Sequence, residues 1–304
     1  MAEDGVVTLR EVLAAGLSRK DVRRAVESGR WRRLGRAVYR IRAMGGADPA
    51  AVRRASIRAA VLSLGAGAVA VFDTAAELHG IAGLRQGVTI HVSVPGAVAK
   101  VRVDDRVQVH QLSLPDDAVS AVRGIAATTP LRTAADLICR LDRFAAISVL
   151  DSSLNRGLLV PADLGAIPAL IRGRRGAVAA RRYVAEADGR AQSPLETRVR
   201  LRCTDGRVPP DDLQHPIRDT DGYLLAVADL AWPAARVAVE ADGREPHGSP
   251  DAIYQDRWRQ NRMANAGWTI LRFTWADTLR SGYIPETVRS ALRRSSRSSR
   301  SSRS

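Results

Sequence analysis

The chain has 304 residues, of which 45% are hydrophobic and 26% charged, a composition typical of a soluble globular protein of about two domains. Its formal net charge is +15, of which five arginines in the last twelve residues account for +5, and such an excess indicates a polyanionic partner, most often nucleic acid. A membrane-spanning or disulfide-stabilised protein is excluded, because the longest charge-free apolar run, residues 59–72, is shorter than the roughly 20 residues a bilayer needs and the two cysteines suit a reduced cytoplasm.

Residues 1–45 have the outline of a winged helix-turn-helix domain. The pattern predicts a helix over residues 6–15, followed by a second helix over 19–28 that begins at the N-cap Ser18. Residues 30–42 then alternate around a glycine like a short hairpin. Helix, turn, helix and hairpin in this order predict a winged helix.

The charge of this segment points to DNA. Residues 19–42 contain ten bases and two acids, a net charge of +8. A helix with an arginine-rich exposed face can enter the major groove of double-stranded DNA, and a basic wing can contact phosphates. The predicted DNA-binding residues are Arg19, Lys20, Arg23, Arg24, Arg32, Arg33 and Arg36. The alternative is a solvated charged helix in a small packing module.

Residues 46–185 are predicted to form an α+β middle domain. Helices are expected near residues 50–63, 130–141 and 143–156, and a strand is expected within 87–95. His91 and His110 lie on strand-like segments and are interpreted as partly exposed strand residues rather than ligands.

The pattern changes again at residue 186. A helix capped by Ser193, three strand-like segments, a helix near 250–265 and a further strand follow one another, which predicts an α/β domain over residues 186–292. The last twelve residues, "RRSSRSSRSSRS", cannot bury a core and are predicted to be a disordered Arg/Ser tail, 293–304. The whole chain is thus expected to be an α/β multidomain protein.

Acidic residues interrupt two neighbouring apolar strands of this domain. Asp229 lies in one strand and Glu240 in the next, and the short turn between them should pair the strands antiparallel. Glu240 and Asp242 are two residues apart, so they point to the same face. Clustered carboxylates repel one another unless a hard cation such as Mg²⁺ (or Mn²⁺) binds them, and that cation can activate water for phosphodiester hydrolysis. The alternative is that these acids are solvated strand ends.

Residues 193–280 resemble small nucleases related to the very-short-patch repair (Vsr) endonuclease. The resemblance rests on "SPLETRVR", "VADLAWP", "RVAVEADGREPH" and "QDRWRQNRMANAGWTILRFT", in that order. It implies the restriction-endonuclease-like fold of the PD-(D/E)XK superfamily and a Mg²⁺-dependent endonuclease. The segment "AAGLSRKDVRRAVESGRWRRLGRAVYR" resembles the winged-helix domain of AbiEi-family antitoxins, and "TTPLRTAADL" resembles a segment that follows that domain.

The nuclease resemblance implies a catalytic set, with metal ligands among its acids. That set is Glu196, Asp229, Glu240, Asp242, His247 and Arg257. Asp242 stands where the superfamily usually has a lysine, so His247 is a candidate general base and Arg257 a candidate source of positive charge. Asp242 is a candidate further metal ligand beside Asp229 and Glu240. Glu196 has an equally good alternative role as the third residue of a capping box that begins at Ser193.

Two functions follow from these patterns. The first is a DNA-binding protein whose C-terminal domain is a Mg²⁺-dependent endonuclease. The second, motivated by the missing lysine, is a non-catalytic AbiEi-like antitoxin that regulates transcription and has a toxin partner. An RNA nuclease ranks last, because the sequence shows no aromatic stacking platform typical of single-strand readers.

Overall fold

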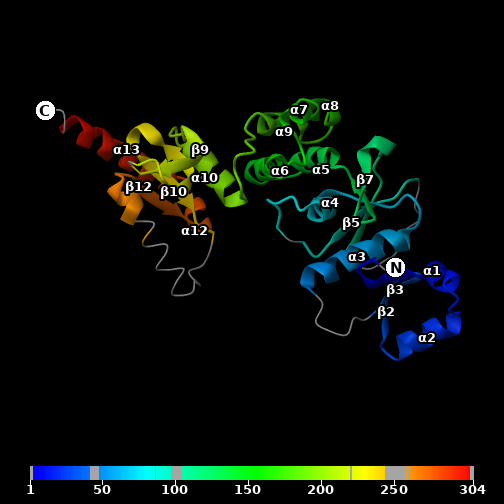
Figure 1. Cartoon of the computed structure of the whole chain (residues 1–304). Helices are drawn as coiled ribbons and strands as arrows, with labels where there is room; N and C mark the ends of the chain where they lie inside the picture. The colour runs from blue at the N-terminus through cyan, green and yellow to red at the C-terminus, as the bar shows by residue number, and fades with distance from the viewer. Residues whose placement is uncertain are drawn as a thin grey trace. The chain divides into compact units, whose positions relative to one another are not determined.

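The structure is a computed structural model of the chain that describes residues 3–41, 48–85, 87–96, 105–219, 221–243, 258 and 261–301 (Figure 1). Contacts divide the chain into two compact units. The first unit comprises Met1–Arg140 with Ala162–Ala177, and the second comprises Leu141–Pro161 with Val178–Ser304. Residues 141–161 and 178–185 of the expected middle domain therefore pack with the C-terminal residues.

The first unit begins with a three-stranded antiparallel sheet of order β1-β3-β2 and the helices around it. Its elements are η1 (Glu3–Gly5), β1 (Val6–Thr8), α1 (Leu9–Ala14), α2 (Arg19–Glu27), β2 (Trp31–Gly35), β3 (Val38–Ile41) and α3 (Pro49–Leu64). The second helix and the hairpin are confirmed. The predicted helix over 6–15 is wrong for its first three residues, because they pair with β3 and Thr8 then caps α1 through a capping box with Glu11.

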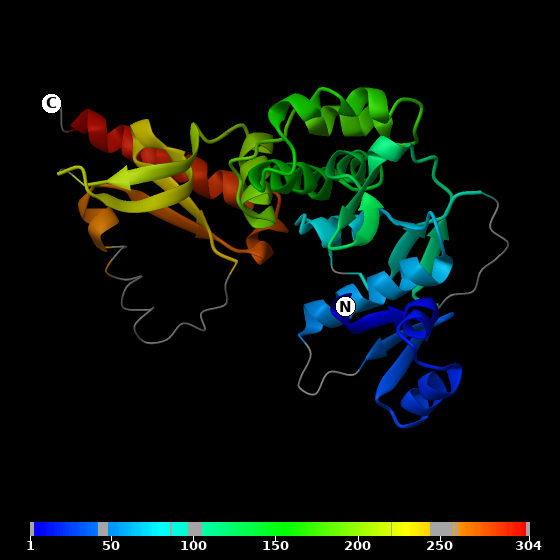
Figure 2. The ribbon, with the colours of Figure 1, turned by 45° about the vertical axis from the view of Figure 1, so that its right-hand side comes forward.

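Helix α3 is shared between this small sheet and a larger one (Figure 2). One face of α3 presents Ala55 and Ala59 to Val6 and Val38 of the small sheet. Its other face contributes to the core of the larger sheet through Ile57, Ala60 and Val61. The helix therefore completes the winged-helix core beyond the predicted boundary at residue 45.

The larger sheet of the first unit has five strands in the order β6-β5-β4-β8-β7. Its elements are β4 (Val69–Ala70), α4 (Phe72–His79), β5 (Ile90–Ser93), β6 (Val107–His110), η2 (Asp116–Ala118), β7 (Val119–Val122), β8 (Ile125–Thr128) and α5 (Pro130–Ile138). The short helices α7 (Pro161–Leu164) and α8 (Ile167–Leu170) follow later in the chain. The helices expected near 50–63 and 130–141 and the strand expected within 87–95 are confirmed.

The second unit contains a four-stranded mixed sheet of order β12-β11-β10-β9. Its elements are α6 (Arg143–Asn155), α9 (Ala177–Val184), α10 (Pro194–Asp205), β9 (Asp212–Arg218), β10 (Leu224–Trp232), η3 (Pro233–Ala235), β11 (Val237–Ala241), β12 (Thr269–Phe273), α12 (Trp275–Thr278) and α13 (Tyr283–Ser301). Strands β9, β10 and β11 form an antiparallel meander, and β12 pairs parallel to β11. The predicted order of one helix, three strands and a later strand is confirmed, and most of the helix predicted near 250–265 lies outside the described residues.

Both faces of this sheet are covered. Side chains of α10 and α13 form one core with β10 and β11, including Val199, Leu230, Val239 and Val288. Ile217, Ala228, Ala238 and Met263 form a second core. A strand buried on both faces reads as a continuous apolar run, which explains why the isolated acids in β10 and β11 stand out in the sequence.

Helix α13 corrects the prediction of a disordered tail. The helix runs to Ser301, nine residues into the segment expected to be disordered. Ile284, Val288 and Ala291 anchor it in the core, and Ser295 Oγ donates a hydrogen bond to the Ala235 carbonyl at 2.7 Å. Arginine is a good helix former, so a helix that is already anchored extends through the Arg/Ser sequence.

Candidate functional site

Helix α2 presents an exposed cationic face whose position is fixed by its cap. Ser18 Oγ accepts from Asp21 N at 3.2 Å, and Asp21 Oδ2 accepts from Ser18 N at 2.9 Å, which completes a capping box. Hydrogen bonds that the Ser18 hydroxyl and the Ser18 backbone N donate to the Asp21 carboxylate lower the pKa of Asp21. Val22 and Ala25 are buried beneath the helix. The predicted DNA-binding residues of this helix, Arg19, Lys20, Arg23 and Arg24, are all exposed.

The hairpin of β2 and β3 forms a basic wing. Arg32, Arg33 and Arg36 are exposed along it, so all seven predicted DNA-binding residues face solvent. Gly35 brings the wing against α3, because a Cβ at this position would lie 2.1 Å from Ser63 Oγ. Ala37 has a φ of 56°, a left-handed conformation that closes the turn. The wing is thus held by backbone geometry, and its arginines extend from it.

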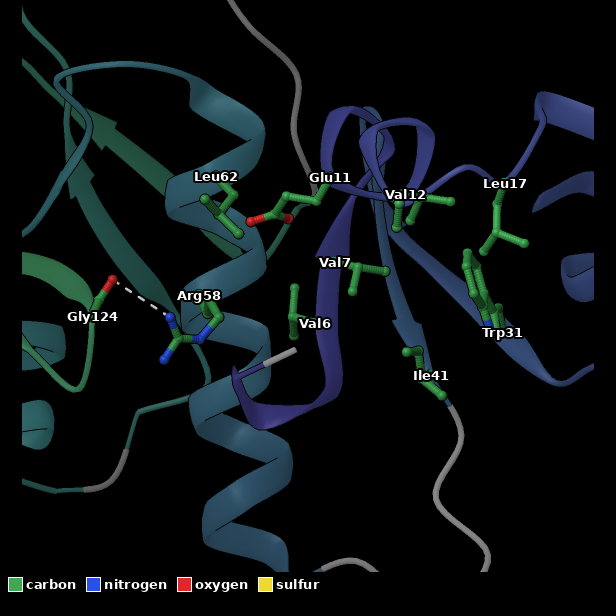
Figure 3. A pocket seen from close by; sticks show the side chains of 11 residues that line it. Val6, Val7, Glu11, Val12, Leu17, Trp31, Ile41, Arg58, Leu62 and Gly124 are labelled. Carbon is green, nitrogen blue, oxygen red and sulfur yellow. Dashed lines mark hydrogen bonds between the residues drawn. The ribbon is translucent and has the colours of Figure 1, made fainter. Parts of the chain in front are cut away.

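A pocket of about 520 Å³ lies between β1, α1 and α3 (Figure 3). Its walls are mostly apolar and include Val6, Val12, Trp31 and Leu62. Its charged residues are already bonded within the protein: Glu11 Oε2 accepts from Thr8 N at 2.7 Å, and Arg58 bonds to Asp4 and to two backbone carbonyls. The pocket therefore offers an apolar hollow with its polar groups occupied.

The acidic residues of the second unit lie side by side, as the strand pattern predicts. Leu230 pairs with Val239 in the β10–β11 register, and Asp229 and Glu240 are the next residues along. Asp229 Oδ2 accepts a hydrogen bond from Ala241 N at 2.7 Å. Glu240 Oε2 pairs with Arg272 Nε of β12 at 2.9 Å. Three strands thus bring two carboxylates and one guanidinium to the same end of the sheet.

Glu196 reaches the same cluster from α10. Its Oε2 accepts from Gln192 N at 2.8 Å and from Gln214 Nε2 at 2.9 Å, and the residue is 8% exposed. Ser193 Oγ caps the helix by accepting from Glu196 N at 3.2 Å, but the Glu196 carboxylate bonds to Gln192 N rather than to Ser193 N. Glu196 is therefore not a reciprocal capping-box acid, and its carboxylate is turned toward β9.

The environment of Asp229 disfavours the charged form of its carboxyl. Burial raises its pKa to about 6, and the hydrogen bond from Ala241 N opposes that rise. The negative charges of Glu196 and Glu240 raise the pKa further, and a hydrogen bond from Gln214 lowers it. A buried carboxyl held near two other carboxylates is the kind of group that marks functional sites.

Gln214 belongs to this cluster, and sequence reasoning left it out of the site. It has a φ of 55° inside β9, a left-handed conformation that is uncommon for a residue with a side chain. Its neighbours Leu213 and His215 pair with Leu230 and Ala228, which places it across from Asp229. Its amide contacts Glu196 and Asp229. The sequence does not mark a polar strand residue such as Gln214 as part of a site, because its neighbours depend on the strand register.

The remaining predicted residues are less closely tied to the cluster. Asp242 follows the end of β11, is half-buried, and donates from its backbone N to the Phe273 carbonyl at 2.8 Å. His247 and Arg257 lie outside the described residues. Within the described ranges, no three His, Cys, Asp or Glu side chains are placed to hold a metal ion. The carboxylate oxygens suit Mg²⁺ chemically, but those of Asp229 and Glu240 are engaged with protein donors, so the metal site of Asp229, Glu240 and Asp242 stays a prediction.

A histidine pair lies at the edge of the larger sheet. His91 Nδ1 and His110 Nε2 are 2.9 Å apart, and both rings pack against Phe72. Burial, followed by the nearby His91 and Arg140, lowers the pKa of His110 to about 4. The two histidines are therefore neutral near pH 7 and form a half-buried hydrogen-bonded contact. This arrangement agrees with the prediction that both are partly exposed strand residues.

The capped cationic helix, the basic wing and the shared helix α3 define a winged-helix protein of the class that binds DNA. Residues 2–42 match the family described as "Transcriptional regulator, AbiEi antitoxin", and residues 68–186 match the "AbiEi antitoxin C-terminal domain". The chain therefore contains both AbiEi antitoxin domains, and the resemblance of its N-terminal part to that family is confirmed. Both matches end by residue 186, so the nuclease resemblance of residues 193–280 stays a prediction.

Two proteins of Mycobacterium tuberculosis, the uncharacterized proteins MT2308 and Rv2248, are each 35% identical to this chain over 217 residues. The similarity covers 71% of this chain and 78% of either relative, so the chain belongs to the same family as these two proteins, a family with AbiEi antitoxin domains. The crystal structure of the RV2827C protein from the same organism is similar over 64% of this chain and 74% of that one, with 18% identity and a TM-score of 0.42. Across the described ranges, no helix is long and apolar enough to cross a membrane.

Proposed function

We propose that this protein is a transcriptional regulator of the AbiEi antitoxin type that binds double-stranded DNA through α2 and the β2–β3 wing. The observation that carries the proposal is the set of seven exposed basic side chains on two adjoining elements of a winged helix. Arg19 and Arg23 are one helical turn apart, as are Lys20 and Arg24, so they form one continuous cationic face. Such a face fits the major groove, and the wing fits the flanking phosphates.

The proposal is tested by DNA binding of the Arg23→Ala/Arg24→Ala variant. Binding of the full chain to a labelled duplex from its own promoter is measured by fluorescence anisotropy at several salt concentrations. If both arginines contact phosphates, the affinity falls and the slope of log K against log salt decreases by about 2. If either arginine reads a base, the loss is confined to the specific duplex.

A matched control removes two exposed arginines from another element. Arg181 and Arg182 lie on the exposed surface of α9 in the second unit, and Arg181→Ala/Arg182→Ala lowers the net charge by the same amount. This variant should keep the affinity and salt slope of the unaltered protein. An equal loss in both variants would show that the binding depends on net charge and would overturn the proposal for α2.

A toxin encoded beside this protein is the proposed partner, and the support is the match of residues 68–186 to the AbiEi antitoxin C-terminal domain. Expression of the neighbouring reading frame should arrest growth, and co-expression of this protein should restore it. The Arg23→Ala/Arg24→Ala variant separates the two roles. If it restores growth, neutralisation does not require the cationic face of α2, and the DNA-binding proposal is unaffected.

A second candidate function is favoured by the carboxylates of Asp229 and Glu240, which lie side by side on β10 and β11, with that of Glu196 nearby. We propose that this cluster forms a Mg²⁺-dependent nuclease site, with Asp229, Glu240 and Asp242 as the residues that would hold the ion, which would activate water when bound. Incubation with supercoiled plasmid and Mg²⁺ or Mn²⁺ should then produce nicked circles. Nicking that persists in Asp229→Asn and Glu240→Gln would overturn this candidate while leaving the regulator proposal intact.

A further inference from the structure

An arginine of the second unit stands out because it is packed between aromatic rings with no acidic partner. Arg198 on α10 lies with its Cζ 4.5 Å from the centre of the Phe144 ring and 5.7 Å from the centre of the Trp275 ring. Within the ranges that the structure describes, its Nε has no hydrogen-bond partner although it is buried, a feature that it shares with the Nε of Arg200. Burial, followed by the positive charge of Arg202, lowers the pKa of Arg198. A buried donor without a partner is a cost that native proteins usually avoid.

Neighbouring arginines show the usual arrangement. Arg143 pairs with Glu186 and Asp205, and Arg200, two residues from Arg198, pairs with Asp151 at 2.8 Å. Among the described residues, Arg198 has no carboxylate at such a distance. Arg143 and Arg200 are thus paired with carboxylates, whereas Asp142 acts on Arg198 only through its charge and forms no ion pair with it in the described part of the chain.

A second guanidinium lies beside the first. Arg202 is one turn further along α10, with its Cζ 4.8 Å from the Phe144 ring, and its Nε donates to the Thr278 carbonyl at 2.9 Å. Two like charges four residues apart on a helix destabilise it by themselves. Phe144 stacks against both guanidiniums and orients them. A pair of oriented guanidiniums is suited to a phosphate group, which it can bind through several hydrogen bonds at once.

An aromatic platform completes this surface. Trp275, the first residue of α12, is 48% exposed and borders Arg198. It follows Phe273 by two residues, and Phe273 pairs with Ala241 at the end of β11. Trp275 is therefore held on a fixed backbone, with its ring beside the guanidinium and open to solvent. An exposed tryptophan beside cations is the combination with which proteins bind unpaired nucleotides.

We infer that Arg198, Arg202 and Trp275 form a binding site for single-stranded nucleic acid, in which the two guanidiniums hold a backbone phosphate and Trp275 stacks on the neighbouring base. All three residues, and Phe144 that orients the arginines, belong to the second unit. The site is thus separate from the winged helix and requires no metal ion. The sequence alone shows no aromatic stacking platform, because Trp275 and Arg198 come together only where α10 and α12 are in contact.

The test uses the full chain with the duplex-binding surface weakened by Arg23→Ala/Arg24→Ala. Binding of a labelled oligothymidylate of about 12 nucleotides, within the length that one such site covers, is followed by anisotropy. Adding Arg198→Gln/Arg202→Gln should weaken binding at least ~10-fold, and adding Trp275→Ala should weaken it ~5- to 100-fold, the range expected for loss of one stacked base. Quenching of tryptophan fluorescence on binding should disappear in Trp275→Phe.

Two further variants keep the test decisive if the glutamine pair disturbs the fold. Arg293→Gln/Arg294→Gln removes two exposed charges from α13 in the same unit and should bind as the parent does. Arg198→Lys/Arg202→Lys retains both charges but loses the planar groups that stack on Phe144, so it should bind several-fold more weakly. Unchanged binding by the lysine pair, or equal loss in the α13 control, would overturn the inference.

The nature of the ligand is tested by competition. Unlabelled oligothymidylate should displace the probe, whereas a blunt duplex or a phosphorylated acidic peptide of equal charge should compete at least ~10-fold less well. Equal competition by the duplex would overturn single-strand binding. Equal competition by the peptide would overturn the nucleic-acid assignment in favour of a general anion site. Failure of duplex binding by the winged helix would leave these outcomes unaffected, because the residues of the proposed single-strand site all belong to the second unit.

Discussion

At the scale of single residues, the buried carboxyl of Asp229 destabilises the folded protein when it is charged. Its pKa of about 6 lies above the ordinary value of 3.8. Between about pH 4 and pH 6, the Asp229 carboxyl is therefore protonated in the folded protein and ionised in the unfolded chain. The stabilising contribution of this proton is fully present below about pH 4 and is lost as the pH rises through 6. Above that pH, the charged carboxylate lowers the free energy of unfolding by about 1–3 kcal/mol.

Asp229→Asn should therefore stabilise the protein at neutral pH. The asparagine oxygen can still accept from Ala241 N, while the charge near Glu196 and Glu240 is removed. We expect the free energy of unfolding in urea to rise by about 1–3 kcal/mol near pH 7.5, by roughly half of that near pH 5, and to change little below about pH 4, where the carboxyl is protonated in both states. The exposed Asp211→Asn serves as control. A gain at pH 5 as large as at pH 7.5 would contradict the assigned pKa.

Sequence reasoning located this cluster only in part. Asp229 and Glu240 could be predicted as neighbours, because two apolar strands joined by a short turn must pair antiparallel. Gln214 could not, because its contribution depends on the β9 register and on a left-handed backbone that its residue type does not indicate. The direction of the Glu196 carboxylate could not be predicted either, because the sequence at the start of α10 fits a capping-box acid and a site residue equally well.

At the scale of elements, α2 depends on its cap to present the cationic face. Replacing Ser18 by alanine removes the oxygen that accepts from Asp21 N. Loss of such a cap costs about 1 kcal/mol and frays the first turn, where Arg19 and Lys20 lie. We expect Ser18→Ala to weaken duplex binding several-fold with all seven basic residues retained, as measured by anisotropy. Ser18→Thr keeps the capping oxygen and should bind normally; if both variants bind normally, the first turn does not contact DNA.

Helices and strands were predicted well where a local sequence feature such as an N-cap marks them. They were predicted poorly where pairing with a distant strand determines the secondary structure. Ser18 and the glycine-centred hairpin identified α2 and the wing. Residues 6–8 fit the apolar pattern of a helix equally well, and only pairing with β3 makes them a strand. The Arg/Ser tail has the composition of a disordered segment, but α13 begins in the core and continues through it as far as Ser301. The composition of the Arg/Ser segment does not reveal that it continues a helix that begins in the core.

At the scale of the whole molecule, the net charge of +15 is distributed over surfaces with different roles. The winged helix of the first unit carries the cationic face and wing, which suit duplex phosphates. The second unit carries Arg198 and Arg202 beside an exposed tryptophan, which suit an unpaired strand. The two proposed activities, duplex binding by the first unit and single-strand binding by the second, should therefore be separable by mutation.

The first unit itself is held together by Arg58. This residue on α3 is 7% exposed, pairs with Asp4 at 3.1 Å, and donates to the carbonyls of Arg123 and Gly124, so it joins the N-terminus, α3 and the β7–β8 turn. Burial raises the pKa of Asp4, but the hydrogen bonds from Arg54 and Arg58 outweigh it and leave the pKa lowered. The ion pair therefore stabilises the unit above pH 4 and is lost as the pH falls and Asp4 becomes protonated.

Arg58→Met should destabilise the first unit while leaving the second unchanged. Methionine fills much of the same volume but leaves the Asp4 carboxylate and two carbonyls without this donor, a loss of about 2–4 kcal/mol. Hydrogen exchange followed by mass spectrometry should show faster exchange over β1, α3 and β7–β8 and unchanged exchange over β9–β12. The exposed Arg10→Met is the control. If exchange accelerates equally in both units, they unfold as one cooperative body, and the division of the chain into two independent units is wrong.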